Sequence, residues 1–489
     1  MINGPKFNNI KTKEAFRSSL GIEETINTMQ ANLCQAINNN TPYAYYFAFI
    51  LWCFYDYEKV TKNESYSIKG AYEYLKKQNF FFSLAHILEN KNIKGAIGSN
   101  HITTKINLNS DGFLYEENYL DSTQSMDYYI PGLDTLMLMK TESLDGNKLS
   151  HPTVTEYGKI LGEVFENTII NTEYYKNYRN FDKSVPKQVL LELSNTITLD
   201  LKNNIEIKDT LKNIFFNNKY IDLSDSLCLS KDLIIYINSK YEKDVIINSL
   251  RNVLFDYFSP RGNDYEFPEE LNDIIKKWEL VTARRYFTFG LSIIWKYMLP
   301  LIEEPISFNE WFNKSINTYK LDFDINRSVK ETINFIDLDY KYREDIINRC
   351  RKDGFSEEKA ISDGISLLLY VYKRISNRDD INTNHTYIVN SDWDTLPLYS
   401  YFDLVDKYLD KPLYVLIEYI MKNYLIMQNE RTAYRKLVNE NKDGYHFEKI
   451  SDKYVLSRNY YFGLGNDRLI ALAGILDQLD MLEGVNYER

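Results

Sequence analysis

Residues 44–55 read AYYFAFILWCFY and form the most apolar run of the chain. The run is twelve residues long, whereas a membrane-spanning helix needs about 20. Pro42 suits the first turn of a helix, and Thr41 can cap that helix. Because the run is apolar nearly all round, we expect a buried helix that passes Trp52 and continues towards Lys59, at the centre of a helical unit.

Apolar residues recur at helical spacing along much of the remaining chain. The expected helices cover residues 22–37, 71–88, 153–170, 278–299, 354–374, 412–438 and 467–482. Gly accounts for 19 and Pro for 11 of the 489 residues, which is well below their usual shares of about 7% and 5%. Because turn-rich sandwiches and barrels need many of both, the sequence predicts a mainly α-helical, multi-helical protein. We expect helix to exceed strand by about three to one or more.

Three stretches predict small amounts of β-structure. Residues 93–120 mix β-branched residues with Gly, Asn and Ser, which favours short strands or an irregular hairpin, and residues 233–238 predict one weak strand. Residues 445–458 read YHFEKISDKYVLSR and predict a β-hairpin that turns at Ser451 and Asp452. A long helix, a hairpin and a short final helix are compatible with a C-terminal winged-helix-like module.

The length of the chain indicates more than one domain. A single hydrophobic core stops growing near about 250–300 residues, so 489 residues predict two or three packed units. We expect an N-terminal helical domain with a β insertion over residues 1–172. A central helical domain follows over residues 173–400, and the winged-helix-like module covers residues 401–489.

The charge of the chain limits how it can contact nucleic acid. Lys and Arg number 58 against 69 Asp and Glu, a net charge of −11, whereas a protein that coats nucleic acid with its whole surface is basic. Between residues 431 and 468, however, eight basic residues stand against five acidic ones, with aromatic residues interleaved. The alternative is a solvated face of a packed helical domain. The candidate DNA-binding residues are Arg431, Arg435, Lys436, Lys453, Arg458 and Arg468.

Local catalytic and cofactor motifs are missing from the sequence. It contains no P-loop pattern, no HExxH, no GxSxG and no zinc-deaminase pattern, and no two of its five histidines lie within one helical turn. We therefore predict no catalytic residues, no metal site and no cofactor. Asp392 and Asp394 form a DxD pair that can hold Mg²⁺, with an Asx-turn as the alternative. Arg284 and Arg285 suit either an anion site or a structural ion pair.

Histidines, cysteines and the N-terminus give further expectations. His86 lies in an apolar helix and is expected in the core, whereas His446 lies in the expected hairpin and is expected at the surface. The four cysteines form no CxxC pattern, which fits free thiols in a reducing compartment. Residues 1–6 do not lead into a signal-peptide pattern, so we expect a cytoplasmic protein without membrane association.

Three groups of residues carry a family resemblance. They are Leu20-Gly21, Gln30, Leu33, Ile37, Thr41, Ala44-Tyr45-Tyr46, Phe49 and Trp52; residues 80–88 and 95–99; and residues 432–437, 466–469 and 475–479. Together they resemble uncharacterised proteins found beside bacterial anti-phage systems. The resemblance implies a cytoplasmic role in defence, alongside ATPase or nuclease partners, and it assigns no catalytic residues.

Three functions follow as expectations. The first is a non-catalytic DNA-sensing or scaffolding subunit of a bacterial anti-phage defence complex. The second is a metal-dependent nuclease whose site is assembled from distant acidic residues. The third is a protein-interaction adaptor that makes no contact with nucleic acid.

Overall fold

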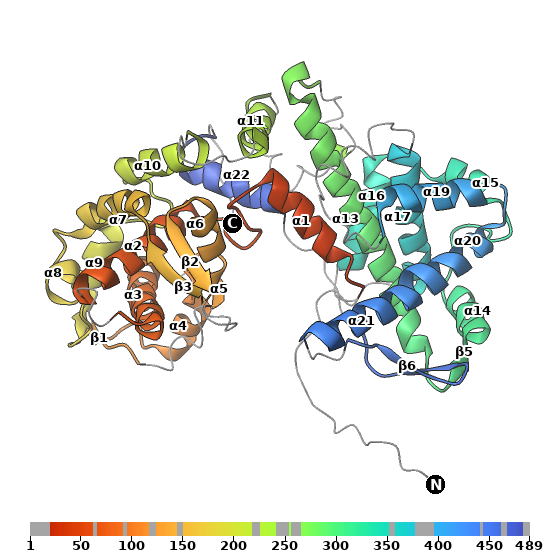
Figure 1. Ribbon diagram of the computed structural model, residues 1–489, viewed down its shortest axis with the longest axis horizontal. Coiled ribbons are helices and arrows are strands. Elements are labelled where there is room, and N and C mark those ends of the chain that lie inside the picture. Colours follow the sequence, from red (N-terminus) through yellow and green to blue (C-terminus); the bar gives the residue numbers. More distant parts are fainter. Residues whose placement is uncertain are drawn as a thin grey trace, which may run out of the picture. The chain divides into compact units, whose positions relative to one another are not determined.

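The structure is a computed structural model that describes most of the chain in twelve stretches. They are residues 20–61, 66–90, 95–116, 124–143, 150–217, 225–240, 254–255, 266–351, 357–376, 396–440, 444–460 and 467–482. Figure 1 shows that helices dominate these stretches and that the sheets are small. The expected mainly α-helical fold is therefore confirmed.

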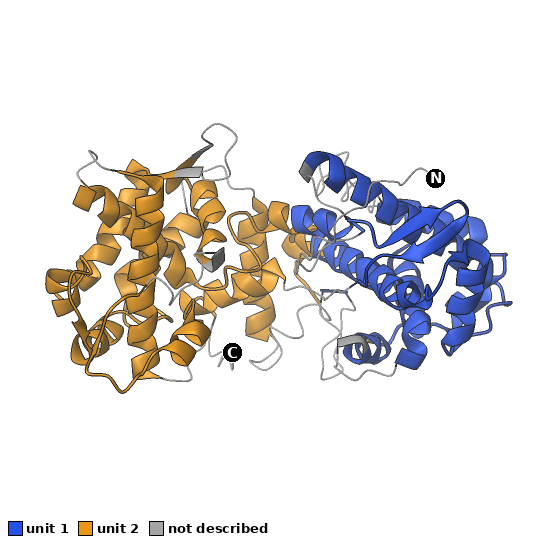
Figure 2. Cartoon of the chain, turned by 90° about the horizontal axis from the view of Figure 1, so that it is seen from below, with its two compact units in different colours: residues 1–29, 254–258, 276–464 blue, residues 30–253, 259–275, 465–489 orange. Residues whose placement is uncertain are grey.

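The chain divides into two compact units, coloured separately in Figure 2. Unit 1 comprises residues 1–29, 254–258 and 276–464, and unit 2 comprises residues 30–253, 259–275 and 465–489. These units interleave distant segments of the chain. The sequence-based division at residues 172 and 400 is consecutive instead, and it stays a prediction.

Unit 2 is built around α2 (Ala44–Thr61), which packs against α3 (Ile68–Glu89) and α7 (Glu156–Ile169). Every residue of α2 from Ala44 to Asp56 is buried, as the apolar run predicts. The surrounding helices are α4 (Ser99–Lys105), α5 (Gln124–Asp127), α6 (Ile130–Thr135), α8 (Glu173–Asn177), α9 (Lys187–Thr196), α10 (Ile205–Phe216), α11 (Asp225–Lys240), the 3₁₀ helix η2 (Glu269–Leu271) and α22 (Arg468–Gln478). Two elements, α1 (Glu23–Leu33) and α13 (Asn272–Met298), contribute residues to both units.

Unit 1 is centred on α13 and α17 (Ala360–Ile375), both of them buried along most of their length. Gly290 and Gly364 let these helices approach closely, because a Cβ atom on Gly364 would lie 2.6 Å from the Ile294 side chain. The remaining helices are η3 (Leu299–Leu301), α14 (Phe308–Thr318), α15 (Val329–Phe335), α16 (Tyr340–Arg351), η4 (Glu357–Lys359), α19 (Leu398–Tyr408), α20 (Leu413–Tyr419), the π-helix η5 (Ile420–Ile426) and α21 (Met427–Glu440).

The expected helix over residues 412–438 is present, with the π-helix η5 in its middle. Helices α20, η5 and α21 follow one another without a break from Leu413 to Glu440. π-Helices are rare in proteins, and those that occur often lie at functional sites. Within this segment the side-chain amide of Asn423 donates a hydrogen bond to the Tyr419 carbonyl oxygen at 3.0 Å.

All described sheets are small and antiparallel. Unit 2 contains the pair β1 (Gly112–Phe113) and β4 (Val185–Pro186), and the hairpin of β2 (Met139–Ser143) and β3 (Ser150–Val154). Unit 1 contains one three-stranded sheet in the order β5-β7-β6, formed by β5 (Ile306–Ser307), β6 (Phe447–Ile450) and β7 (Lys453–Leu456). The expected hairpin over residues 445–458 is confirmed, and its turn residue Ser451 has a φ of 60°.

Two other strand predictions were wrong. Residues 233–238 lie in helix α11, where Leu233, Ile234 and Ile237 are buried at helical spacing. The stretch 95–116 forms helix α4 and only the two-residue strand β1. In α11, packing of an apolar helix face outweighed the β-propensity of single residues.

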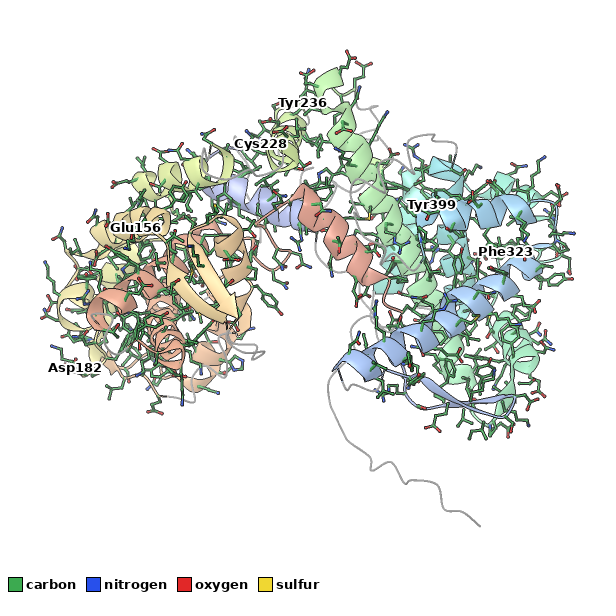
Figure 3. All side chains as sticks on the ribbon, viewed as in Figure 1. Glu156, Asp182, Cys228, Tyr236, Phe323 and Tyr399 are labelled. Carbon is green, nitrogen blue, oxygen red and sulfur yellow. The ribbon has the colours of Figure 1, made fainter. Side chains whose placement is uncertain are left out.

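The described cysteines are free thiols. Cys34 and Cys53 are buried, and burial raises the pKa of Cys34 to about 12. Cys228 is half-buried on α11, where Figure 3 labels it. Among the described helices, none combines the length and the apolar character needed to cross a bilayer.

Candidate functional site

Five of the six candidate DNA-binding residues lie in unit 1, and the sixth lies in unit 2. Arg431 on α21 and Lys453 on β7 are exposed, and neither forms an ion pair with another described residue. Arg435 is half-buried, and its guanidinium pairs with Glu24 at 2.9 Å. Lys436 is only 8% exposed and Arg458 is half-buried. Two of the six side chains are therefore well placed for a phosphate contact.

Helix α21 uses its buried polar face to hold the chain near residue 20. The Gln428 amide and the Thr432 hydroxyl both donate hydrogen bonds to the Leu20 carbonyl oxygen, at 2.8 and 3.0 Å. Gly21 has a φ of +68° and lies so close that a Cβ atom there would be 2.8 Å from Thr432 Oγ1. Arg435 pairs with Glu24 in the same segment, so this arginine also helps to hold the chain near residue 20 within unit 1.

His446 lies in the interior of unit 1, so the expectation of a surface position was wrong. Its ring is 5.6 Å from that of Tyr460 and 6.3 Å from that of Trp295, and only 2% of the residue is exposed. Burial lowers the pKa of His446 to about 4. His86 is buried in unit 2 as expected, and burial lowers its pKa to about 4 as well. Both imidazoles are therefore neutral at pH 7.

Arg468 begins helix α22 and serves the interior of unit 2. Its backbone N–H donates to Gln30 Oε1 at 2.8 Å, and its guanidinium donates to the Ile37 carbonyl oxygen at 2.9 Å. Burial lowers the pKa of this guanidinium. The final helix thus belongs to unit 2 and the hairpin to unit 1, and the winged-helix-like module stays a prediction.

The hairpin of β6 and β7 forms part of the core of unit 1. Strand β5, about 150 residues earlier in the chain, pairs with β7 and completes the sheet. The Trp311 ring lies 5.4 Å from that of Tyr454 and 6.2 Å from that of Phe447, so one face of the hairpin is buried. The other face carries Lys453 and the exposed Ile450.

The other candidate residues fall into two groups. Asp392 and Asp394 lie outside the described residues. Within the described part of the chain, no group of three His, Cys, Asp or Glu side chains is arranged to hold a metal ion. Arg284 and Arg285 are both buried on α13. Arg284 donates to the Leu396 carbonyl oxygen and lies 5.2 Å from the centre of the Phe287 ring.

Sequence reasoning missed a buried polar network in unit 2. The Asp56 carboxylate accepts hydrogen bonds from the Tyr74 hydroxyl and, at 2.9 Å, from the Arg179 guanidinium. The Gln78 amide donates to the Tyr74 hydroxyl at 2.8 Å and accepts from Tyr174 at 2.9 Å. Burial raises the pKa of Asp56, and the Tyr74 hydrogen bond and Arg179 oppose that rise. The sequence signal is the single carboxylate that directly follows the apolar run 44–55.

A second ionic contact lies beside this network. Lys59 pairs with the buried Glu166 at 2.6 Å, and Tyr175 donates a hydrogen bond to the same carboxylate. The Arg179 guanidinium stacks 4.2 Å above the Tyr175 ring, which joins the two groups. These contacts connect α2, α3, α7 and α8, and a fully bonded buried network of this kind fixes how helices pack.

Unit 1 exposes two apolar surfaces on ordered elements. The first, which we name the α21 stripe, comprises Arg431, Tyr434, Leu437 and Val438 at helical spacing, with Tyr434 64% and Val438 62% exposed. The second, which we name the α15 loop, comprises residues 334–339, with Phe335 71% and Leu338 38% exposed. Sequence periodicity marks apolar residues as core, so it gave no signal for either surface.

Comparison with protein-family models, with curated proteins and with solved structures found no significant match. The functional argument therefore depends on the surfaces and contacts of the chain itself.

Proposed function

We propose that the protein is a non-catalytic scaffolding subunit of a multi-protein complex, in the cytoplasmic anti-phage setting that the family resemblance implies. The observation that carries the proposal is the pair of exposed apolar surfaces in unit 1. Contiguous apolar surface on a soluble protein marks sites where another protein binds. Tyr434 in α21 and Phe335 at the end of α15 are large side chains on helical backbone, which lose little entropy when a partner covers them.

The test is purification of the tagged full chain from its own host, followed by native mass measurement. We expect stoichiometric partner proteins with the wild type and their loss when Val438→Asp and Phe335→Asp are combined, since both changes place a charge where a partner packs. Ile205→Asp is the matched control, because Ile205 is 69% exposed but lies in unit 2. A complex of unchanged composition in the double variant would contradict the scaffolding proposal.

Direct DNA contact is the second candidate function, supported by the exposure of Arg431 and Lys453 in the same unit. Each phosphate contact releases about 0.9 counterion on duplex DNA. We therefore expect Arg431→Ala with Lys453→Ala to reduce the slope of log affinity against log salt by up to about two. Fluorescence anisotropy with a labelled DNA duplex measures this slope.

The control for the DNA experiment removes the same charge elsewhere. Lys140→Ala with Lys176→Ala takes two exposed cations from unit 2 and should leave the slope unchanged. Absence of binding, or equal slopes in all three proteins, would exclude a DNA contact through these residues. Cleavage of the duplex that needs Mg²⁺ and is lost in Asp392→Ala with Asp394→Ala would instead support the nuclease alternative.

A further inference from the structure

The two exposed surfaces of unit 1 carry opposite charges next to their apolar residues. The α21 stripe places the exposed cation Arg431 one helical turn before Tyr434. The α15 loop places the exposed carboxylates of Asp337 and Asp339 on either side of Leu338. Within the described part of the chain, none of these three charged side chains forms an ion pair. The α21 stripe thus has an unpaired cation, and the α15 loop has unpaired carboxylates that can bind one.

The α15 loop is held rigidly in position. Lys373 Nζ donates hydrogen bonds to the carbonyl oxygens of Ile336, at 2.7 Å, and Asn334, at 3.3 Å. Tyr370 donates to the Leu338 carbonyl oxygen at 3.3 Å, and the Ile336 side chain is buried. These contacts fix the backbone while Phe335 and Leu338 remain exposed.

Other charges near the α15 loop have their own roles. Asp337 Oδ1 accepts from the Asp339 N–H at 2.9 Å, and Asp339 Oδ1 accepts from the Lys341 N–H at 2.9 Å, which leaves the second oxygen of each carboxylate for a partner. The Arg327 guanidinium lies 5.1 Å from the centre of the Phe335 ring and covers one of its sides. Lys330 and Lys341 are exposed nearby and do not pair with the loop, so its negative charge is local to the two carboxylates that flank Leu338.

The two surfaces lie at opposite ends of one continuous helical segment. The Val329 N–H on α15 donates to the Lys411 carbonyl oxygen at 2.9 Å, and the Leu413 N–H donates to that of Arg327 at 2.8 Å. Helix α15 therefore lies beside the start of α20, as Figure 1 shows. Tyr434 follows Leu413 by 21 residues, or about 30 Å of helix. Because unit 1 is compact, the α21 stripe and the α15 loop of one chain are held too far apart to meet.

We propose that the α21 stripe of one copy binds the α15 loop of a second copy, head to tail. Apolar contact between Tyr434 and Val438 on one side and Phe335 and Leu338 on the other would exclude water, and Arg431 would pair with the loop carboxylates. Such a contact is heterologous, so each pair of copies leaves one surface of each kind unused and can add further copies or close into a ring. The inference rests on the scaffolding function and gives it a repeating architecture.

The closing experiment is sedimentation velocity on the purified full chain. We expect the wild type to form species larger than a dimer as its concentration rises, and to dissociate in high salt. Phe335→Asp removes the loop surface and Val438→Asp removes the stripe surface, and each change places an unpaired carboxylate in the contact. We expect each variant to raise the dissociation constant more than about 100-fold. Ile205→Asp in unit 2 should associate like the wild type.

Mixing the two variants gives the sharpest result. The Phe335→Asp protein keeps its stripe and the Val438→Asp protein keeps its loop, so the mixture should form a 1:1 heterodimer and nothing larger. A symmetric contact, stripe to stripe or loop to loop, would instead let one variant dimerise by itself and leave the other monomeric. That outcome would overturn the proposal, as would a wild type that stays monomeric at every concentration. If either aspartate variant is unfolded by circular dichroism, Phe335→Ser and Val438→Ser replace the pair, since both sites are exposed.

The same samples separate this inference from the scaffolding function on which it rests. A wild type that is monomeric when pure, but keeps stoichiometric partners from its host, overturns the head-to-tail contact and leaves scaffolding in place. If the two purified variants form the 1:1 heterodimer, but the wild type retains no other protein from its host, the head-to-tail contact is supported. The scaffolding of other proteins is then overturned.

Discussion

Replacing Trp52 with alanine should lower the free energy of unfolding by about 3–5 kcal/mol, the usual cost of removing a large buried aromatic side chain. Trp52 is fully buried on α2. Its ring stacks on that of Phe165 at 5.2 Å and lies 5.6 Å from that of Phe82. These neighbours come from α7 and α3, so the substitution leaves a cavity where three helices meet. Urea denaturation followed by circular dichroism measures the loss.

Two control variants separate packing from other causes. Val60→Ala lies on the same helix at a 44% exposed site, and its effect should stay within about 0.5 kcal/mol. Trp52→Phe should cost less than the alanine variant, because the indole N–H of Trp52 has no hydrogen-bond partner to lose. Helices α2 and α7 both lie in unit 2, so amide hydrogen exchange in these helices reports on unit 2 itself. An unchanged midpoint and unchanged exchange in Trp52→Ala would contradict the buried position.

Helices were predictable from the sequence wherever their apolar spacing is long and strong. The run 44–55, the periodic stretch 278–299 and the segment 412–438 all became helices, because burying an apolar face stabilises a helix more than the propensity of any single residue. The hairpin over 445–458 was predictable because its turn and its alternating pattern agree. Each of these predictions depends on neighbours within one element.

Features that depend on distant residues could not be predicted from the sequence. Strand β5 is only two residues long, and its partner β7 follows about 150 residues later. Helix α11 was partly mistaken for a strand because its Leu and Ile residues also suit a sheet. The pairing of α22 with unit 2 depends on contacts such as that from Arg468 to Ile37, which no local pattern encodes.

The candidate site shows the same limit for charged residues. Counting the basic residues between 431 and 468 found a locally positive segment, but a count does not say which helix face each residue occupies. Lys436 is buried and Arg431 is exposed on the same helix. The polar residues Gln428 and Thr432 mark the inner face, so a helical-wheel plot of α21 carries the signal that the count lacks.

The Asp56–Arg179 pair supplies the second large effect. Asp56 is fully buried, whereas Arg179 is partly exposed. Arg179→Ala therefore leaves a buried carboxylate without its cation, and we expect it to lower the free energy of unfolding by about 3 kcal/mol or more at pH 7. Lys159→Ala, which breaks the surface pair with Glu156 in the same unit, should change stability little. Equal effects of the two variants would show that Asp56 is not desolvated.

The dependence of this loss on pH identifies its cause. Burial already raises the pKa of Asp56 in the folded wild type, and removing Arg179 raises it further above the unfolded value. A group whose folded pKa is raised contributes stability at low pH and loses it as the pH rises through that pKa. The difference in the free energy of unfolding between Arg179→Ala and the wild type should therefore shrink as the pH falls towards the ordinary range of an aspartate.

Adding Asp56→Asn removes the buried charge, so the double variant should be more stable than Arg179→Ala at pH 7 and lack this pH dependence. A deficit that stays constant with pH would mean that lost packing of Arg179 on Tyr175, rather than the stranded carboxylate, causes the destabilisation.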